Sequence, residues 1–333
     1  MRAAVIEGVG RVTVTDVPEP VPGPREVLVE VAACGICGTD LHILDGEFAP
    51  SLPIVPGHEF AGTVVALGAA AREARPALRV GARVAVDPSL YCHECHYCRI
   101  GRSNLCERWN AIGVSVPGGA AQYAAAPAAN CVLLPDQLRL EDAALIEPLS
   151  CAIRGYDVLR SNLGAHVLIY GSGTMGLMML RLAQRTGAAS VDVVDLNPER
   201  LVAAAALGSS AAVTSADELD RPRGWELVID ATGAGPAIQD GLGRVAPGGT
   251  FLQFGVASYA TQVTIDPYRI YNQEITITGS MAVLHSFERA AELFAGGILD
   301  PAVLISDRLP LADYGPAIDR VRRGLGRKVQ VLP

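Results

Sequence analysis

Lysine is almost missing from this chain of 333 residues, because Lys328 is the only one. Mechanisms that need a Schiff-base lysine or a proton-relaying lysine therefore have only this residue to use, near the end of the sequence. The Tyr-x3-Lys pair of short-chain reductases is absent for the same reason. This scarcity argues against that class and directs the search for catalytic groups to other side chains.

Long apolar runs are missing as well. Half of the residues are hydrophobic, but Gly, Pro or charged residues interrupt the longest stretches well before the roughly 20 residues that a membrane helix needs. The formal net charge is -8 and the basic residues are scattered, which argues against a nucleic-acid partner held through phosphates. Residues 1–10 show no signal-peptide pattern. We expect a cytoplasmic protein without membrane or nucleic-acid partners.

Four cysteines, in contrast, crowd into a short lobe at about residues 88–108, with the spacing C-x2-C-x2-C-x7-C. Thiolates this close can surround one Zn²⁺ at about 2.3 Å each, whereas most disulfide pairings among them would be strained. A disulfide knot is the alternative, but the chain is far longer than the small secreted proteins that use one. A closed shell of four thiolates predicts a structural zinc bound by Cys92, Cys95, Cys98 and Cys106.

The pattern of apolar, Gly and Pro residues changes along the chain, and this change predicts two domains. Residues 1–86 contain short apolar runs punctuated by Gly and Pro, which predicts a β-rich domain. Residues 149–281 repeat the order strand, Gly turn, helix, which predicts a parallel α/β sheet. The tail has a helical stretch at 286–295 and ends in a strand, from Lys328 on, that could return to the first domain.

A G-x-G-x-x-G motif directly follows the apolar strand at 166–170 and opens a helix, as in dinucleotide-binding proteins. Asp195 ends the next strand, where a carboxylate can bind both adenosine-ribose hydroxyls and repel a 2′-phosphate, which favours NAD over NADP. Arg200 could flank the ribose or bind a 2′-phosphate, and Asp195 could be only a turn residue. The predicted cofactor residues are Gly171, Gly173, Thr174, Met175, Gly176, Asp195 and Arg200.

A second metal site is predicted in the first domain. Cys37 and His58 supply a thiolate and an imidazole, and Asp40 or Glu59 could orient them. A third ligand is needed, and we prefer Glu147, at the domain junction, to Cys151 or Glu59. An open fourth position would let the metal bind an alcohol oxygen and lower its pKa, so that hydride can leave for nicotinamide.

His42 lies two residues beyond Asp40, beside this predicted metal site. Because an imidazole titrates near neutral pH, it can pass a proton to solvent, which favours a proton relay. A surface histidine without a role in the reaction is the alternative.

These motifs together resemble the zinc-dependent medium-chain dehydrogenases, and within that family the sorbitol or polyol dehydrogenase branch. The resemblance implies a GroES-like β-rich catalytic domain (1–148 and 282–333) and a Rossmann domain (149–281). It covers nearly the whole chain and rests on the Cys37-x-Thr39-Asp40-x-His42 segment, the Gly57-His58-Glu59 segment, the four-cysteine lobe, the glycine turn with Asp195, and Ile146-Glu147-Pro148-Leu149.

The resemblance also implies roles for single residues. It implies that Cys37 and His58 bind a catalytic zinc, which makes two zinc ions per chain. Thr39 would hydrogen-bond the substrate oxygen and start a proton relay through the cofactor ribose to His42. Glu147 stands where polyol and threonine dehydrogenases have Glu. In polyol enzymes that Glu binds the metal directly or through water, with the residue at the position of Glu59 taking part, so the resemblance leaves the third ligand open between Glu147 and Glu59. Lys328 matches a position where a basic residue approaches the cofactor phosphate.

Three functions remain open from the sequence. The first is an NAD- and zinc-dependent dehydrogenase of a polyol, sugar alcohol or cyclitol. The second is an L-threonine 3-dehydrogenase or a simple alcohol dehydrogenase, and the third is an NAD-binding relative that has lost catalysis. The β-branched run at 274–279 would lie at a sheet edge, where symmetric pairing predicts a homotetramer built from homodimers.

Overall fold

The computed structural model describes residues 1–48, 51–159 and 163–333. These residues form two compact units. Unit 1 comprises Met1–Ser150 with Val283–Pro333, and unit 2 comprises Cys151–Ala282. The domain boundaries predicted from the sequence, 148/149 and 281/282, lie beside these divisions. No helix in the described ranges is both long and apolar enough to cross a bilayer.

Unit 1 is built on a seven-stranded sheet in the order β16-β17-β3-β4-β5-β9, with β8 paired to β3 as well. Its strands are β3 (Glu26–Gly35), β4 (Glu59–Leu67), β5 (Arg83–Val86), β8 (Tyr123–Pro127), β9 (Cys131–Leu133), β16 (Ile305–Pro310) and β17 (Lys328–Leu332). Two small pairs accompany it, β1 (Arg2–Gly8) with β2 (Arg11–Asp16) and β6 (Ser89–Leu90) with β7 (Asn110–Ala111).

The helices of unit 1 are mostly short. They are α1 (Gly38–Leu44), α2 (Ala71–Ala74), α3 (His96–Arg99), α4 (Leu140–Ala143), α10 (Phe287–Ala295), α11 (Pro301–Leu304) and α12 (Tyr314–Arg322). The longer helix α5 (Ile146–Val158) begins in unit 1, and the division between the units falls within it.

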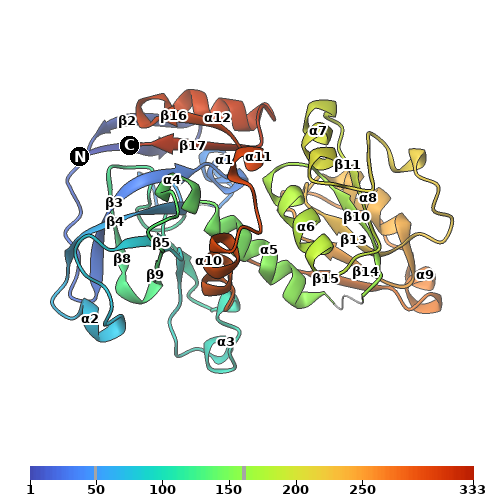
Figure 1. Cartoon of the computed structure of the whole chain (residues 1–333), viewed down its shortest axis with the longest axis horizontal. Coiled ribbons are helices and arrows are strands. Elements are labelled where there is room, and N and C mark those ends of the chain that lie inside the picture. Colours follow the sequence, from blue (N-terminus) through green and yellow to red (C-terminus); the bar gives the residue numbers. More distant parts are fainter. Residues whose placement is uncertain (49–50, 160–162) are drawn as a thin grey trace. The chain divides into compact units, whose positions relative to one another are not determined.

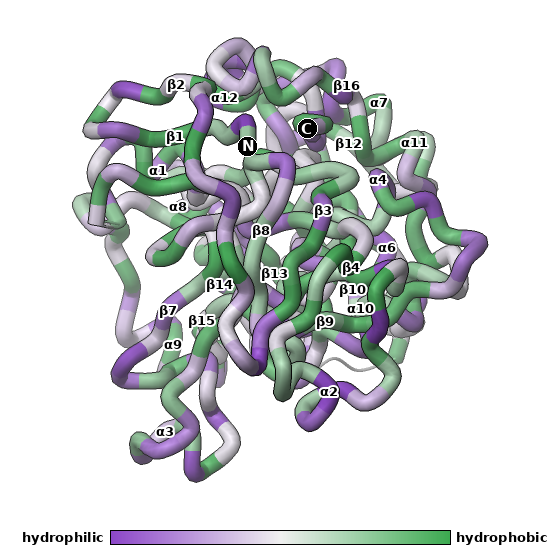
Figure 2. Tube along the Cα trace, turned by 90° about the vertical axis from the view of Figure 1, so that its left-hand side faces the viewer, coloured by the Kyte–Doolittle hydropathy of each residue, from purple (hydrophilic) through white to green (hydrophobic). Residues whose placement is uncertain are grey.

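The C-terminal strand β17 pairs antiparallel with β3, so the last residues return to a sheet that begins near the N-terminus, as predicted (Figure 1). Residues far apart in the sequence therefore share one core, which includes Val29, Phe60, Val84, Tyr314 and Val331. Figure 2 shows hydrophobic stretches along β3 and β4 and strongly hydrophilic segments at α2. Burial of these apolar side chains is the main force that holds the sheet together.

Unit 2 contains a six-stranded parallel sheet in the order β12-β11-β10-β13-β14-β15. This is the doubly wound order 3-2-1-4-5-6 of dinucleotide-binding domains, so the predicted Rossmann architecture is confirmed. The strands are β10 (His166–Tyr170), β11 (Ser190–Val194), β12 (Ala211–Val213), β13 (Trp225–Asp230), β14 (Val245–Gln253) and β15 (Thr276–Gly279), and the helices are α6 (Thr174–Arg185), α7 (Pro198–Ala206), α8 (Gly235–Arg244) and α9 (Pro267–Asn272).

Local sequence explains where two of these helices begin. Asn197 caps α7 by accepting a hydrogen bond from the backbone N–H of Glu199, and Asp266 caps α9 in the same way. Each cap is followed by a proline at the first helical position, where its missing N–H costs nothing. The cap of α7 fixes the chain just after β11, which is where the predicted ribose-binding carboxylate lies.

Candidate active site and metal centres

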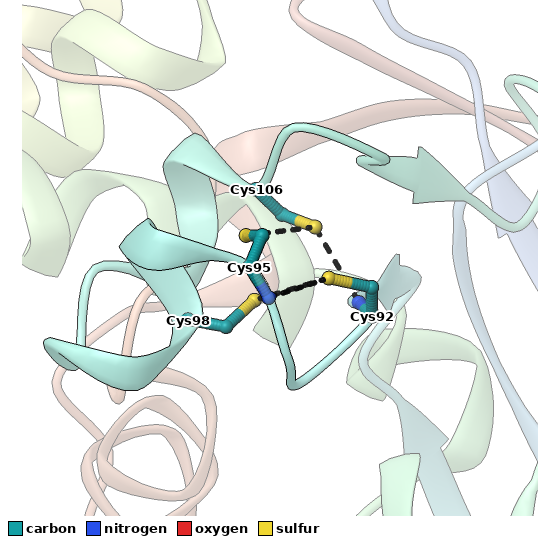
Figure 3. Close-up of side chains that lie close together, drawn as sticks. All are labelled: Cys92, Cys95, Cys98 and Cys106. Carbon is teal, nitrogen blue, oxygen red and sulfur yellow. Dashed lines mark hydrogen bonds between the residues drawn. The ribbon is translucent and has the colours of Figure 1, made fainter.

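The four predicted structural ligands converge in the lobe that carries α3 (Figure 3). The Sγ atoms of Cys92 and Cys98 lie 3.9 Å apart, as do those of Cys95 and Cys106. A disulfide would need about 2.05 Å. The edge of a tetrahedron with Zn–S bonds of about 2.3 Å is about 3.8 Å, so this arrangement fits one tetrahedral zinc ion.

Backbone amides favour the thiolate form of Cys92 and Cys95, whereas burial raises the pKa of the Cys98 thiol to about 12. The backbone N–H of Cys95 donates to Cys92 Sγ at 3.3 Å, and this bond is the main cause that lowers the pKa of the Cys92 thiol to about 6. Cys106 Sγ accepts from the backbone N–H groups of Cys92 and Arg108, each at 3.4 Å. Because a thiolate is the form that binds metal, these backbone hydrogen bonds favour metal binding at Cys92 and Cys95.

A second group of metal-binding side chains lies where β3 leads into α1 and where β4 begins. Cys37, His58 and Glu59 each place a ligand atom there, all within 4.8 Å of one another. Cys37 caps α1, and its backbone N–H donates to Asp40 Oδ2 at 2.8 Å. This bond fixes the turn that presents the thiol of Cys37 to the imidazole of His58.

The charges around His58 are those of a site that accepts a cation. Burial alone lowers the pKa of His58, but the hydrogen bond to Cys37 and the charges of Cys37, Asp40 and Glu147 outweigh burial and raise it to about 10. In the described part of the chain, His58 Nδ1 and Asp40 Oδ1 are buried without a hydrogen-bond partner. Converging anionic groups and unsatisfied buried atoms fit a bound metal ion.

Lys328 occupies a position different from the one implied by the resemblance. The residue is 4% exposed, and its ammonium donates to both carboxylate oxygens of Glu59, at 2.7 Å each, and to the Ile36 carbonyl at 3.2 Å. All three N–H donors are used, so none remains for a cofactor phosphate, and that expectation is corrected here. A Cβ at Gly35 would lie 2.1 Å from Glu59 Oε2, so only glycine leaves room for this ion pair.

The two other candidates for the third ligand are Glu147 and Cys151. Glu147 is buried in the first turn of α5 and is close enough to His58 for its charge to raise the pKa of that imidazole. It is not among the described residues whose ligand atoms form the compact group. Cys151 is half-buried and belongs to unit 2.

His42 and Thr39 both lie on α1, directly after Cys37. The thiol of Cys37 lies 3.8 Å from Thr39 Oγ1, so the hydroxyl stands beside the candidate metal ligands. His42 Nδ1 lies 2.6 Å from Glu47 Oε2. Sequence reasoning missed Glu47, although the Asp-Gly-Glu segment that follows the helix is a recognisable helix-ending signal.

The glycine turn of unit 2 connects β10 to α6, as the motif predicts. Gly171 has φ of +98°, and a Cβ at Gly176 would lie 1.8 Å from the Gly171 carbonyl oxygen. Gly173 caps α6, and a Cβ there would meet only the guanidinium of Arg200, at 4.0 Å. The backbone is therefore open to a phosphate at the N-terminus of α6, which fits a dinucleotide. Thr174 and Met175 form the first turn of this helix.

Asp195 lies at the end of β11, beside this turn. Its Oδ2 accepts hydrogen bonds from the backbone N–H of Ser172 at 2.7 Å and from the Ser172 hydroxyl at 3.0 Å. Its Oδ1 accepts from the backbone N–H of Asn197 at 2.8 Å. The carboxylate thus joins the glycine turn to the start of α7, so the turn role and the ribose-binding role do not exclude each other.

Two family profiles match the chain. "Alcohol dehydrogenase GroES-like domain" matches residues 23–136, and "Zinc-binding dehydrogenase" matches residues 174–296. The first range contains both groups of metal-binding side chains except Glu147, and the second contains Asp195, Arg200 and the end of the glycine turn.

Named relatives extend this similarity over almost the full length. The chain is 35% identical to D-arabinitol dehydrogenase 1 of Uromyces fabae, over 92% of this chain and 90% of that protein. It is 32% identical to D-altritol 5-dehydrogenase of Agrobacterium fabrum, over 92% of each. A solved structure described as a zinc-binding dehydrogenase of Sinorhizobium meliloti 1021, bound to NADP, aligns with a TM-score of 0.93 and 34% identity, covering 100% of this chain and 99% of that one.

Proposed function

Because the chain belongs to the zinc-binding alcohol dehydrogenase family, we propose that it oxidises a secondary alcohol of a polyol, sugar alcohol or cyclitol with NAD as hydride acceptor. The observation that carries this proposal is the closeness of the Cys37 thiol to the His58 imidazole, two side chains that bind zinc, in a chain similar over most of its length to two polyol dehydrogenases. Loss of catalysis is a poor alternative, because the proposed metal ligands are all present.

The residues of α1 and its surroundings have separate tasks in this proposal. A bound zinc ion would supply Lewis acidity to the alcohol oxygen, and NAD would be the hydride acceptor. Cys37 and His58 would hold the metal, with Glu147 as the preferred third ligand, because Glu147 is close enough to His58 for its charge to raise the pKa of that imidazole, whereas Glu59 is paired with Lys328. The Thr39 hydroxyl would hydrogen-bond the alcohol oxygen and start a proton relay, through the cofactor ribose, that ends at His42.

A substrate screen tests the proposal directly. Zinc-loaded protein is mixed with NAD and, in turn, with polyols, cyclitols, L-threonine and primary alcohols, and NADH formation is followed by absorbance. We expect the highest kcat/KM for a polyol or cyclitol. Faster turnover of L-threonine or a primary alcohol would replace the proposed substrate class, and a protein that turns over none of them would contradict the assignment.

The choice of NAD over NADP rests on Asp195. A carboxylate at the end of β11 can accept two ribose hydroxyl hydrogen bonds and repels a 2′-phosphate. Arg200, whose guanidinium lies over Gly173, is proposed to contact the adenosine half of the cofactor. The NADP in the similar Sinorhizobium structure makes this choice worth measuring.

Replacing Asp195 by alanine should lower kcat/KM for NAD about 10- to 100-fold, since hydrogen bonds to a charged group contribute about 1.5–3 kcal/mol. The preference for NAD over NADP should shrink by at least as much. Steady-state kinetics with both cofactors measure this. Asp195→Ala also removes the hydrogen bond from the Ser172 hydroxyl to Asp195. Ser172→Ala is the control for that loss and should leave the preference for NAD over NADP intact. A wild-type enzyme that uses NADP as well as NAD would contradict the role of Asp195.

We also propose that unit 2 supplies a dimer contact. Strand β15 ends the sheet, and its Ile277 is 44% exposed beside a hollow of about 240 Å³. Leu242, Ile265, Ile270, Ile275 and Ile277 contribute to the lining of this hollow. A free strand edge flanked by apolar side chains favours pairing with the same strand of a second copy, and two such dimers would form the homotetramer.

Replacing Ile277 by lysine should shift the protein towards monomer, because a charge at the paired edge must lose water on association. Multi-angle light scattering at micromolar concentration measures the mass. Val202→Lys, on the exposed face of α7, is the matched control and should leave the mass unchanged. A wild-type mass near the 34.8 kDa of one chain would contradict the oligomer.

The cytoplasm is the proposed location. All eight cysteines are free thiols in the structure, and most of them lie in the two candidate metal sites. Reduced thiols persist in a reducing compartment, which supports the location predicted from the sequence.

A further inference from the structure

His42 is held by a carboxylate that belongs to none of the motifs discussed above. Its Nδ1 lies 2.6 Å from Glu47 Oε2, and the two side chains are only 22% and 29% exposed. A contact this short between an imidazole nitrogen and a carboxylate is a charge-assisted hydrogen bond. The ring also packs edge-on against Phe48, with ring centroids 5.2 Å apart. The imidazole is therefore fixed in orientation from two sides.

The end of α1 creates this contact. The backbone N–H of Glu47 donates to the His42 carbonyl at 2.8 Å, and that of Gly46 donates to the Ile43 carbonyl at 3.0 Å. These two bonds, with Gly46 at φ of +83°, form a Schellman motif, which folds the residue after the glycine back over the third-last helical residue. A hydrophobic pair usually occupies these two positions, but here they hold Glu47 and His42.

No other carboxylate is recorded at the His42 ring in the part of the chain that the structure describes. Asp45 is nearest along the helix, but both its oxygens accept hydrogen bonds from Arg322 of α12, at 2.7 and 2.9 Å. These bonds are the main cause that lowers the pKa of Asp45, and the charge of His42 adds to it. Asp319 is the other charged group of α12 that acts on Arg322. Asp45 is thus neutralised by Arg322, whereas Glu47 faces His42 directly.

We propose that Glu47 is a positioning residue for proton transfer: it holds the Nδ1–H of His42, so that Nε2 is left as the proton acceptor. The proposal rests on the proposed function, in which His42 takes the alcohol proton. When the alcohol is oxidised, its O–H proton would pass along the relay that starts at Thr39 to Nε2 of His42, and the ring would become an imidazolium. Glu47 accepts the Nδ1–H bond before and after this step. The proton then leaves Nε2 for solvent, which restores the starting tautomer.

The tautomer can be observed without any substrate. In ¹⁵N-labelled, zinc-loaded enzyme, long-range ¹H–¹⁵N spectra distinguish a histidine protonated at Nδ1 from one protonated at Nε2, and His42→Gln identifies the His42 signals among six histidines. We expect neutral His42 to be the Nδ1–H tautomer, and Glu47→Ala to move it to Nε2–H. Asp45→Asn is the matched control and should leave the tautomer unchanged. An Nε2–H tautomer in the unmutated enzyme would overturn the proposal.

Kinetics then test whether this contact serves the reaction. On the best alcohol from the screen, Glu47→Ala should lower kcat about 10-fold, with KM changed by less than about twofold, since positioned proton acceptors contribute about 10²–10⁴-fold. Glu47→Gln keeps an acceptor oxygen for Nδ1–H and should recover most of this loss. In the His42→Gln background, Glu47→Ala should have no further effect, because both changes remove the same function.

The kinetic outcomes distinguish the proton-accepting role of His42, which belongs to the proposed function, from the positioning role of Glu47. A normal kcat in His42→Gln would overturn both the proton role of His42 and the role of Glu47. A low kcat in His42→Gln with a normal kcat in Glu47→Ala would overturn only the latter. An equal loss from Glu47→Ala with and without His42 would also overturn it, because Glu47 would then act on the fold and not through the imidazole.

Discussion

Replacing Cys37 by alanine is expected to lower kcat by about 10³-fold or more while the protein stays folded. The thiolate belongs to the group with the unsatisfied buried atoms, and metal assistance to an alcohol contributes several kcal/mol of transition-state stabilisation. The side chain is half-buried, at the start of a seven-residue helix, and supports little packing. Zinc content by mass spectrometry, kcat and Tm together measure the effect, and zinc should fall by about one ion per chain.

Cys95→Ala is the matched control, because it removes the same side chain from the four-cysteine lobe. No residue of α3 in that lobe is buried, so a zinc ion bound by the four cysteines would contribute folding free energy directly. We expect a lower Tm and lower soluble yield from Cys95→Ala before any specific loss of kcat. A Cys37→Ala enzyme that keeps its activity but melts as early as Cys95→Ala would reverse the two assignments.

Replacing Lys328 by methionine is expected to destabilise the protein by about 3–5 kcal/mol, since a buried carboxylate is then left without its cation. Although burial lowers the pKa of Lys328, the carboxylate of Glu59 and other anionic groups outweigh burial and raise it, so the ammonium is charged at neutral pH. For a unit of this size the loss corresponds to a fall in Tm of roughly 10 °C. Thermal unfolding of the zinc-loaded enzyme measures it.

The double variant Lys328→Met/Glu59→Gln distinguishes a stranded charge from a lost packing contact. Both charges are then replaced by neutral side chains of similar shape, which is often nearly neutral for stability. We expect it to regain most of the lost Tm. If the double variant melts even lower than Lys328→Met alone, the ion pair is not what the lysine contributes.

The features that the sequence predicts well are those in which nearby residues act together. The four cysteines fall within fifteen residues, so their spacing alone defines a tetrahedral shell. The glycine turn is equally local, because the clash that a Cβ at Gly176 would make involves Gly171, five residues away. In both cases the residue types and their spacing determine the geometry before any tertiary contact forms.

The ion pair of Lys328 with Glu59 could not be predicted in this way. Its partners are 269 residues apart and meet only because β17 enters the sheet beside β3. The resemblance to the family implies that Lys328 approaches the cofactor phosphate, whereas in the structure Lys328 is buried in unit 1. The contact of Glu47 with His42 was missed for a different reason, since the helix end that creates it was not assigned from the sequence.

The position of β17 also has a consequence for how the protein is made. The bond from Lys328 to Ile36 spans 292 residues, which a ribosome needs roughly 15–60 s to synthesise at about 5–20 residues per second. Unit 2 is continuous and leaves the ribosome complete while the sheet of unit 1 still lacks an interior strand. During that interval the end of β3, at Cys34 and Gly35, lacks the partner strand β17, and Glu59 lacks the ammonium of Lys328. The nascent chain is therefore most exposed to aggregation and to chaperones before β17 emerges.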